Sequence, residues 1–308
     1  MPIESARVLF VLALIALLPV PVAVQGPPPR PPVIDMHVHS TTTAPRDLAK
    51  LEALNVRYLF LAGLVDDLRE WASVDASRYL PSLVLTCEHG RALFVNRSCW
   101  DGAADLPDVS WLREELRSGR VKALGEAVPQ ALGISPADAR LEPYWQLAEE
   151  FDVPVAIHMG PGPPGAAYES SPAPFKFPAF GMALSDPLLL EGVLLRHKKL
   201  RLFVMHAGWP RLESMLALLY AHPNVYVDVA ALQAPFMVPR PSYYRHLRGL
   251  VEGGFGKRIM FGSDFAPQVA PGIEAILAAD FLSAEQKSDI LCGNAARFLR
   301  LKPSICSP

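Results

Sequence analysis

The sequence predicts an α/β protein in which eight parallel strands, each followed by helical sequence, close into a barrel. The first observation is the regular alternation of short apolar runs with amphipathic stretches from residue 33 onward. The second is the number of runs, because eight strands close a (β/α)8, or TIM, barrel. The third is their composition: runs of about four to eight residues, rich in β-branched and aromatic residues, are typical of strands buried on both faces.

The elements follow from this pattern in chain order. The predicted strands are Val33–Val38, Val56–Ala62, Ser82–Thr86, Val121–Leu124, Val153–Ile157, Leu200–Met205, Val225–Val229 and Arg258–Phe261. Several intervening helices begin at a proline or after an Asp or Ser cap. Helices are predicted over Pro45–Leu54, Ser110–Ser118, Pro136–Phe151, Asp186–His197, Pro210–Ala221 and Pro241–Glu252, with extra C-terminal helices over Ser283–Cys292 and Ala295–Leu301.

Composition and motifs exclude several classes of protein. A net charge of -2, from 29 basic and 31 acidic residues, gives no electrostatic footprint for nucleic acid. With 51% hydrophobic and only 19% charged residues, most of the chain is not disordered. No G-x-G-x-x-G motif follows the first strand, which argues against an open dinucleotide-binding sheet. Because the interior shows no repeat and no linker, residues 33–308 are expected to form a single barrel domain.

The N-terminus reads as a targeting segment. The apolar run Val8–Leu18 follows a short charged stretch and precedes small residues, so residues 1–25 are predicted to be a signal peptide. The run is shorter than a bilayer span needs, so no stable span is expected after processing, although an uncleaved anchor helix is the alternative. Residues 26–32 form a Pro-rich tether. The mature protein is therefore expected to be exported, to the periplasm or the extracellular space.

Export bears on the cysteines. In an oxidising compartment Cys87 can pair with Cys99, and Cys292 with Cys306, each pair closing a short loop. Free or buried thiols are the alternative. The cysteines lack the CxxC pairs of a zinc knuckle.

Histidines and acids collect where the predicted strands end, and in a barrel of this kind the chemistry lies at the carboxyl ends of the strands. Because side chains alternate along a strand, His37 and His39 share one face. Imidazoles buried together need a binding partner, and a divalent metal is the natural one. The residues at these positions are His37, His39, Glu126, His158, His206 and Asp264. The other four histidines, His89, His197, His222 and His246, lie on predicted loops or helices and are expected at the surface.

A resemblance to a known family rests on motifs in a fixed order: VIDMHVH, VPVAIHMG, FVMHAGWP, HPNVYVDVA, RIMFGSDFA and GNAARFL. Together they resemble the amidohydrolase superfamily. More narrowly, they resemble its amidohydrolase-related branch, which includes aminocarboxymuconate-semialdehyde decarboxylase-like enzymes. The likeness covers nearly all of residues 33–301 and is specific for the fold, but not for the substrate.

The resemblance implies roles for these residues. The implied metal ligands are His37, His39, His158, Asp264 and Glu126. Asp264 is also the implied base for the attacking water, and His206 the implied polarising or proton-shuttling histidine, or a ligand of a second ion. Glu126 either binds metal or contacts the substrate. The implied cofactor is one divalent cation or two, with Zn2+ favoured and Mn2+ the alternative.

The function that follows is a metal-dependent hydrolase that uses an activated water on a small amide, ester or lactone. A non-oxidative decarboxylase on the same scaffold is the alternative, and a catalytically inactive binding protein is a third. The expected partner is a small carbonyl compound, and a homodimer remains open.

Several residues around the predicted centre allow two interpretations. Asp35 and Asp228 are expected to orient ligands, although Asp35 could instead simply cap or pair within the barrel; period two places Asp35 on the same face as the paired histidines. Arg211 could clamp a substrate carboxylate or lie at the surface. Three aromatic residues of the long fifth loop could form an apolar lid or simply pack: Phe175, Phe177 and Phe180.

Overall fold

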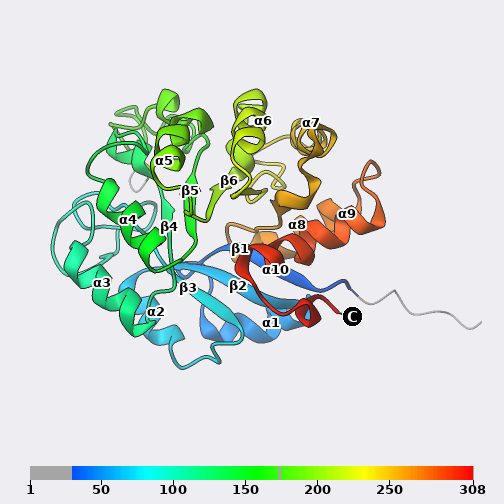
Figure 1. The fold of residues 1–308 in the computed structure, drawn as a ribbon, viewed down its shortest axis with the longest axis horizontal. Helices are drawn as coiled ribbons and strands as arrows, with labels where there is room; N and C mark the ends of the chain where they lie inside the picture. The colour runs from blue at the N-terminus through cyan, green and yellow to red at the C-terminus, as the bar shows by residue number, and fades with distance from the viewer. Residues whose placement is uncertain (1–29, 173–174, 308) are drawn as a thin grey trace, which may run out of the picture. The chain divides into compact units, whose positions relative to one another are not determined.

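Eight parallel strands form the centre of the structure, a computed structural model that describes residues 30–172 and 175–307 (Figure 1). The strands are β1 (Val33–His39), β2 (Val56–Gly63), β3 (Tyr79–Leu83), β4 (Ala123–Ala127), β5 (Val155–His158), β6 (Leu202–Met205), β7 (Val225–Asp228) and β8 (Ile259–Met260). Each lies at a predicted position, with ends that differ by a few residues. The predicted signal peptide lies outside the described residues, as does most of the tether.

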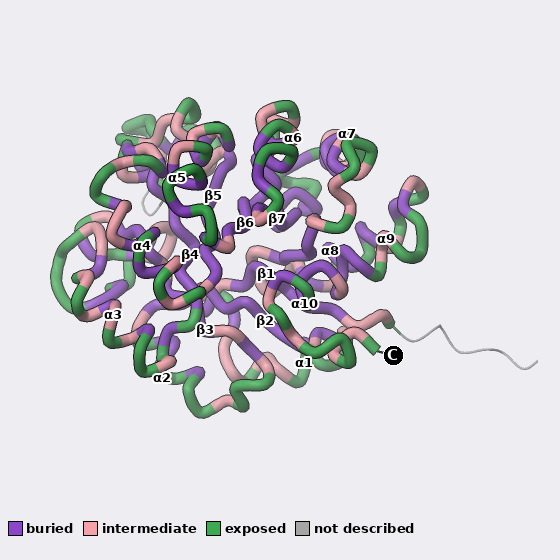
Figure 2. Tube along the Cα trace, viewed as in Figure 1, coloured by how far each residue is buried: buried purple, intermediate pink, exposed green. Residues whose placement is uncertain are grey.

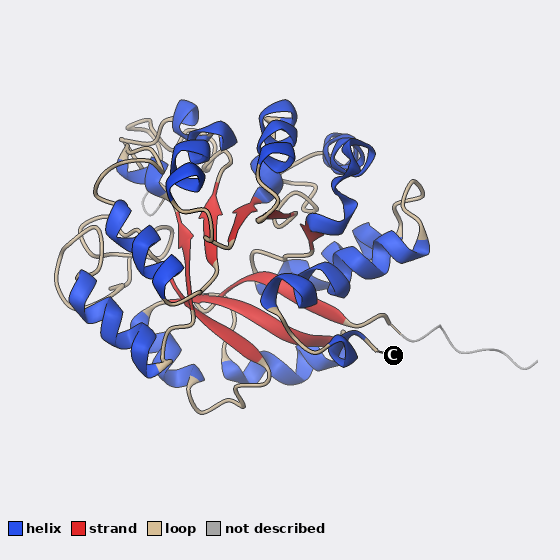
Figure 3. Ribbon diagram, viewed as in Figure 1, coloured by secondary structure: helices blue, strands red, loops and turns tan. Residues whose placement is uncertain are grey.

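The strands pair in chain order from β1 to β8, and every pair is parallel. The segment after β8 closes the ring onto β1: Met36 N donates to Phe261 O at 2.9 Å, and Asp264 N donates to His37 O at 2.7 Å. Figure 3 shows the strands at the centre with the helices around them. The prediction of a TIM barrel is therefore confirmed.

Helices follow the strands around the outside. They are α1 (Leu48–Ala53), α2 (Val65–Trp71), α3 (Val109–Ser118), α4 (Glu142–Glu150), α5 (Glu191–Arg196), α6 (Leu212–Ala221), α7 (Arg240–Leu250), α8 (Val269–Leu277), α9 (Ala284–Ser288) and α10 (Asn294–Leu299). The sequence did not predict α2 or α8. Pro271 and Gly272 lie within α8 and usually interrupt a helix, but Pro271 falls in the first turn, where no backbone N–H is needed.

The buried apolar residues form two main clusters, and the central strands are largely buried (Figure 2). The larger cluster forms an outer layer between the strands and the surrounding helices. The smaller one fills the barrel at the end opposite to the carboxyl ends of the strands. There Phe60 and Phe203 meet edge to face, with ring centroids 5.1 Å apart. α10 covers this end, because its Phe298 packs edge to face on Phe203 at 5.6 Å. The C-terminal helices therefore form the floor of the barrel.

A β-bulge interrupts β1. Asp35 pairs with Leu59 and Val38 with Leu61, so β1 uses three residues where β2 uses two. As a result Met36 packs in the barrel interior and Val38 in the outer layer, which leaves His37 and His39 facing inward. Asp35 does not share their face. It lies between β1 and the end of β8, and the period-two expectation for it is wrong.

Both expected cysteine pairs are disulfide-bonded, with Cα–Cα distances of 6.6 Å for Cys87–Cys99 and 5.8 Å for Cys292–Cys306. The first bond closes a loop after β3, and the second ties the C-terminal turn to the segment before α10. Within residues 30–172 and 175–307, no helix has the length and apolar character needed to cross a bilayer.

Candidate metal centre

The predicted site residues come together at the carboxyl ends of the strands. His39 is the last residue of β1 and His37 lies two residues before it, while Glu126 is the second-last residue of β4. His158 is the last residue of β5, and His206 directly follows β6. Asp264 lies in the segment after β8, where it forms an isolated parallel bridge with Val38 of β1. Five separate parts of the ring thus supply one cluster of imidazole and carboxylate groups.

One half of the cluster is built around β1. The Nε2 atoms of His37 and His39 are 3.1 Å apart. Asp264 Oδ1 lies 3.5 Å from His37 Nε2 and 3.3 Å from His39 Nε2. Glu126 Oε2 lies 3.8 Å and 3.2 Å from the same two nitrogens. Two imidazole nitrogens and two carboxylate oxygens therefore face a common point.

The other half shares Glu126. Its second oxygen, Oε1, is 2.8 Å from His158 Nδ1 and 3.6 Å from His206 Nε2. Those two ring nitrogens are 3.0 Å apart. In each of two trios, one around each Glu126 oxygen, the candidate ligand atoms all lie within 4.8 Å of one another.

The donor set fits a divalent cation. His37, His158 and His206 are all buried, and His158 Nε2 has no hydrogen-bond partner among the described residues. Bringing so many imidazoles and carboxylates out of water is costly unless a positive charge binds them together. Nitrogen and oxygen donors of this kind suit Zn2+ or Mn2+. The residues present could hold one ion, or two that share Glu126.

Asp228 orients two of the histidines. Its Oδ2 lies 3.2 Å from His37 Nδ1, and its Oδ1 accepts the backbone N–H of His206 at 3.0 Å. With Nδ1 of His37 donating to Asp228, the Nε2 lone pair of His37 points into the cluster. The Nε2 lone pair of His206 likewise points into the cluster, because its Nδ1 donates to the carbonyl of Ala230 at 3.0 Å.

Asp35 acts on the backbone. Its Oδ1 accepts the N–H of Ser263 at 2.9 Å and that of His37 at 3.2 Å, so it joins the strand that carries His37 to the segment that carries Asp264. Complete burial raises the pKa of Asp35 to about 7, although these hydrogen bonds oppose the increase.

The acidic and basic side chains of the cluster shift one another's pKa values. Burial alone would lower the pKa of His39, but hydrogen bonds to Asp264 and Glu126 outweigh it and raise the value to about 9. For Glu126, burial acts in the opposite direction and is outweighed by hydrogen bonds from four histidines, so its pKa lies well below the usual range. Burial would also raise the pKa of Asp264, but the nearby His37 and His39 lower it. Both acids are therefore ionised and available as ligands.

Three histidines expected at the surface are buried instead. His197 is 5% exposed and lies between Glu142 (Oε1, 2.9 Å) and Glu149 (Oε2, 3.2 Å) of α4. His246 Nε2 is 2.9 Å from the carbonyl of Ala207, and His222 is also buried. Only His89 of the four is exposed. Pairing with carboxylates and a backbone carbonyl allows His197 and His246 to be buried without belonging to the cluster.

The residues with two interpretations are now placed. Arg211 Nη1 donates to Asp186 at 3.1 Å, so it ties the sixth loop to the fifth. Phe177 is buried and packs against Val128, while Phe175 is 44% exposed. The packing interpretation therefore holds for Phe177.

Two glutamines that sequence reasoning missed support the cluster. Gln130 Nε2 donates to the carbonyl of His158 at 3.0 Å, and Gln233 Nε2 donates to Gly262 O at 3.0 Å, two residues before Asp264. Both are buried. Their only sequence signal is a polar residue in the loop after a strand, which is too common to single them out.

Comparisons with known proteins agree with this geometry. A family model described as amidohydrolase matches residues 99–301. No curated protein shows significant similarity to the chain. Three of the similar solved structures are a probable 2-pyrone-4,6-dicarboxylic acid hydrolase from Acinetobacter baumannii, a dihydroxybenzoic acid decarboxylase from a Polaromonas species with bound manganese, and an amidohydrolase from Burkholderia multivorans with bound zinc.

These structures share the fold at low sequence identity. The hydrolase has a TM-score of 0.58 at 13% identity and covers 87% of this chain and 99% of its own. The decarboxylase scores 0.56 at 12% identity, covering 88% and 97%, and the zinc protein 0.53 at 17%, covering 88% and 100%. At such identities the likeness establishes the fold alone.

Proposed function

Because the chain belongs to the amidohydrolase family, we propose that it is a metal-dependent hydrolase of a small amide, ester or lactone. The observation that carries the proposal is the position of Glu126, whose two oxygens face two separate groups of histidines. His37, His39, Asp264 and Glu126 would hold one cation, and His158, His206 and Glu126 a second. A cation bound there supplies the positive charge that lowers the pKa of a water molecule and polarises a carbonyl group.

Asp264 is the proposed general base. Its side chain is 19% exposed, so it is reachable from the open end of the barrel, and its lowered pKa keeps it ionised at neutral pH. It accepts the proton of the attacking water and returns that proton to the leaving group.

His206 can take either of the roles that the resemblance implies, depending on its protonation. Its Nδ1–H donates to Ala230 O, so the neutral ring presents a lone pair at Nε2. It can therefore bind a cation in the neutral form, and it can donate to a substrate carbonyl only when protonated. Hydrogen bonding to Glu126 raises the pKa of His206 despite its burial, which keeps the protonated form accessible.

A non-oxidative decarboxylase is the second candidate. The likeness to a decarboxylase structure with bound manganese supports it, and the same cluster could bind the carboxylate of such a substrate. The two reactions differ in what is released: an acid with an alcohol or amine in hydrolysis, and carbon dioxide in decarboxylation.

The deciding experiment combines a metal count with a substrate panel. We expect one or two equivalents of zinc or manganese per chain by elemental analysis, and hydrolysis of an ester, lactone or amide. Two equivalents that fall to one or none in a Glu126→Gln variant would support the shared carboxylate. Protein that binds neither ion would refute the proposal, and release of carbon dioxide from a carboxylate panel without hydrolysis would replace it with the second candidate.

We further infer that the protein is exported as a single barrel domain, residues 33–308, after removal of residues 1–25. The two disulfides support this inference, because such bonds persist in oxidising compartments. Mass spectrometry of the mature N-terminus and fractionation of expressing cells test it. A full-length chain retained in the cytoplasm would contradict it.

A further inference from the structure

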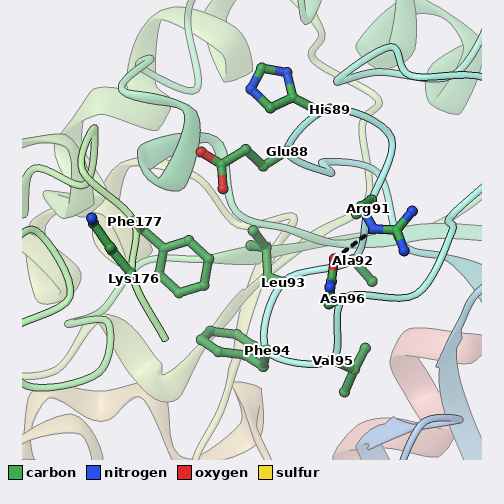
Figure 4. Close-up of a pocket in the computed structure, with 10 residues that line it drawn as sticks. All are labelled: Glu88, His89, Arg91, Ala92, Leu93, Phe94, Val95, Asn96, Lys176 and Phe177. Atoms are coloured by element: carbon green, nitrogen blue, oxygen red, sulfur yellow. Dashed lines mark hydrogen bonds between the residues drawn. The ribbon is translucent and has the colours of Figure 1, made fainter. Parts of the chain in front are cut away.

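A cavity of about 530 Å3 opens between the loop after β3 and the long loop after β5 (Figure 4). One wall consists of residues 88–96, inside the loop that the Cys87–Cys99 disulfide closes. The other wall consists of Lys176 and Phe177. Neither the family nor the proposed chemistry gives this cavity a role.

The cavity is built onto the strand that carries Glu126. Leu85 N donates to the carbonyl of Glu126 at 3.2 Å, and Val128 N donates to Thr86 Oγ1 at 2.7 Å. Val128 also packs in one apolar cluster with Phe177, against which Phe94 lies. The cavity therefore lies at the same end of the barrel as the metal centre, where the remote end of a substrate would be held.

Its inner surface is apolar and aromatic. Phe94 and Phe177 meet edge to face with ring centroids 5.2 Å apart, and Leu93 lies between them and the upper wall (Figure 4). Phe94 also approaches Phe175, at 6.1 Å between centroids. Aromatic faces carry partial negative charge and attract cations.

The charged groups that line the cavity are not equivalent. The Lys176 ammonium forms an ion pair with Glu169, and in Figure 4 it extends to the far side of Phe177. Arg91 Nε donates to Asn96 Oδ1 at 2.6 Å, and its guanidinium points away from the aromatic side chains. The Glu88 carboxylate has no hydrogen-bond or ion-pair partner among the described residues, and Glu88 lines the cavity (Figure 4).

Glu88 is half-buried, and its unpaired carboxylate lines the same cavity as the half-buried Phe94, a combination that is complementary to an organic cation. An anion would be disfavoured, because it would lie near the negatively charged Glu88 carboxylate and the partially negative aromatic side chains. A neutral ligand would fill the apolar surface but would leave the carboxylate unpaired.

We propose that this cavity binds an organic ammonium group carried on an apolar or aromatic body. The ammonium pairs with Glu88, and the body packs on Leu93 and Phe94, whose rear side rests on the buried Phe177. Assigning this group to the remote end of the substrate rests on the proposed function, whereas the binding site itself does not. The wall is preorganised, because the disulfide and hydrogen bonds to Asp105, from Cys87 N at 2.9 Å and His89 N at 2.7 Å, fix the start of the loop.

The test uses three probes of one shape and different charge: 2-phenylethylammonium, 2-phenylethanol and 3-phenylpropanoate. Binding to the purified full-length protein is measured by calorimetry or ligand-observed NMR, without any turnover. We expect the cation to bind at least about fivefold more tightly than the alcohol, the range of a partly exposed charge pair, and the anion to bind most weakly.

Variants locate the site. Glu88→Gln should remove the preference for the cation over the alcohol, and Phe94→Leu should weaken the cation about threefold. The matched control is Asp101→Asn, which removes an exposed acid of the neighbouring loop that does not line the cavity and should change nothing.

Each outcome decides the proposal. Equal binding of cation and alcohol, cation binding that survives Glu88→Gln, or tighter binding of the anion with dependence on Arg91 would overturn it. Since binding requires neither metal nor turnover, a preference for the cation in protein that fails the metal count would leave this site standing while the proposed function falls.

Discussion

Changing Asp228 to asparagine tests how the metal centre is assembled. Asp228 is fully buried and accepts three hydrogen bonds: from the backbone N–H groups of His206 and Ala230 through Oδ1, at 3.0 and 2.9 Å, and from His37 Nδ1 through Oδ2, at 3.2 Å. Asparagine preserves the volume and the first two bonds. Its NH2 group replaces Oδ2 and cannot accept a hydrogen bond from His37, so the Nδ1 proton loses its acceptor. The tautomer of His37 that carries the proton on Nε2 is then favoured.

The magnitude follows from the loss of this one contact. Removing a group that orients a metal-bound histidine weakens metal affinity about 10- to 100-fold, or roughly 1.4 to 2.7 kcal/mol. Competition with a calibrated chelator measures the change, and circular dichroism verifies the fold. Glu149→Gln is the control, because it removes a carboxylate from His197 outside the centre. If the folded Asp228→Asn protein binds metal as tightly as the parent, His37 is not a ligand held in the way described.

Three further predictions concern catalysis, pH and stability. Asp264→Asn should lower turnover about 10²- to 10⁴-fold, because the amide cannot accept the proton of the attacking water. The chain should stay folded, because asparagine tolerates the backbone φ of 73° at this position. Steady-state kinetics together with an unchanged melting temperature would confirm this expectation, and full activity would exclude Asp264 as the base. Because the pKa of His39 is raised from 6.5 to about 9, its contribution to the stability of the metal-free protein should be complete below pH 6.5 and disappear as the pH rises through 9. Thermal melts in chelator from pH 6 to 10 should show that decrease, whereas a flat profile would contradict the assigned contacts. Replacing Cys292 and Cys306 by serine should lower the free energy of unfolding by about 3 kcal/mol and the melting temperature by about 6–12 °C. Calorimetry measures the change, with the Cys87→Ser/Cys99→Ser protein as the comparison. An unchanged melting temperature would show that the Cys292–Cys306 crosslink does not stabilise the barrel.

The ring and its six convergent side chains could be predicted because both depend on local patterns. Buried parallel strands appear as short apolar runs, and the residue after each run must lie at the mouth of the barrel. Asp35 could not be placed, because the bulge in β1 is a feature of pairing with β2 and leaves no mark in the alternation of residues.

Other features depend on contacts between distant segments. His197 is buried because two glutamates of α4 reach it, and the sequence separates these groups by about fifty residues. The cavity beside Phe177 needs the loops after β3 and β5 to meet, and neither loop shows the periodicity that identifies a helix or strand. Gln130 was missed for the same reason, since its partner is a backbone carbonyl of another strand.

The aromatic floor of the barrel has a consequence for how the protein is made. Phe298 seals a core that begins with Ile34 of the first strand, so residues more than 260 positions apart must be present together before that end of the ring is filled. Partial chains emerging from the ribosome expose the unfinished core and cannot assemble the six convergent groups. Binding of a cation by all six groups would therefore follow synthesis of the whole barrel, and a chain delivered unfolded to another compartment would acquire a metal there.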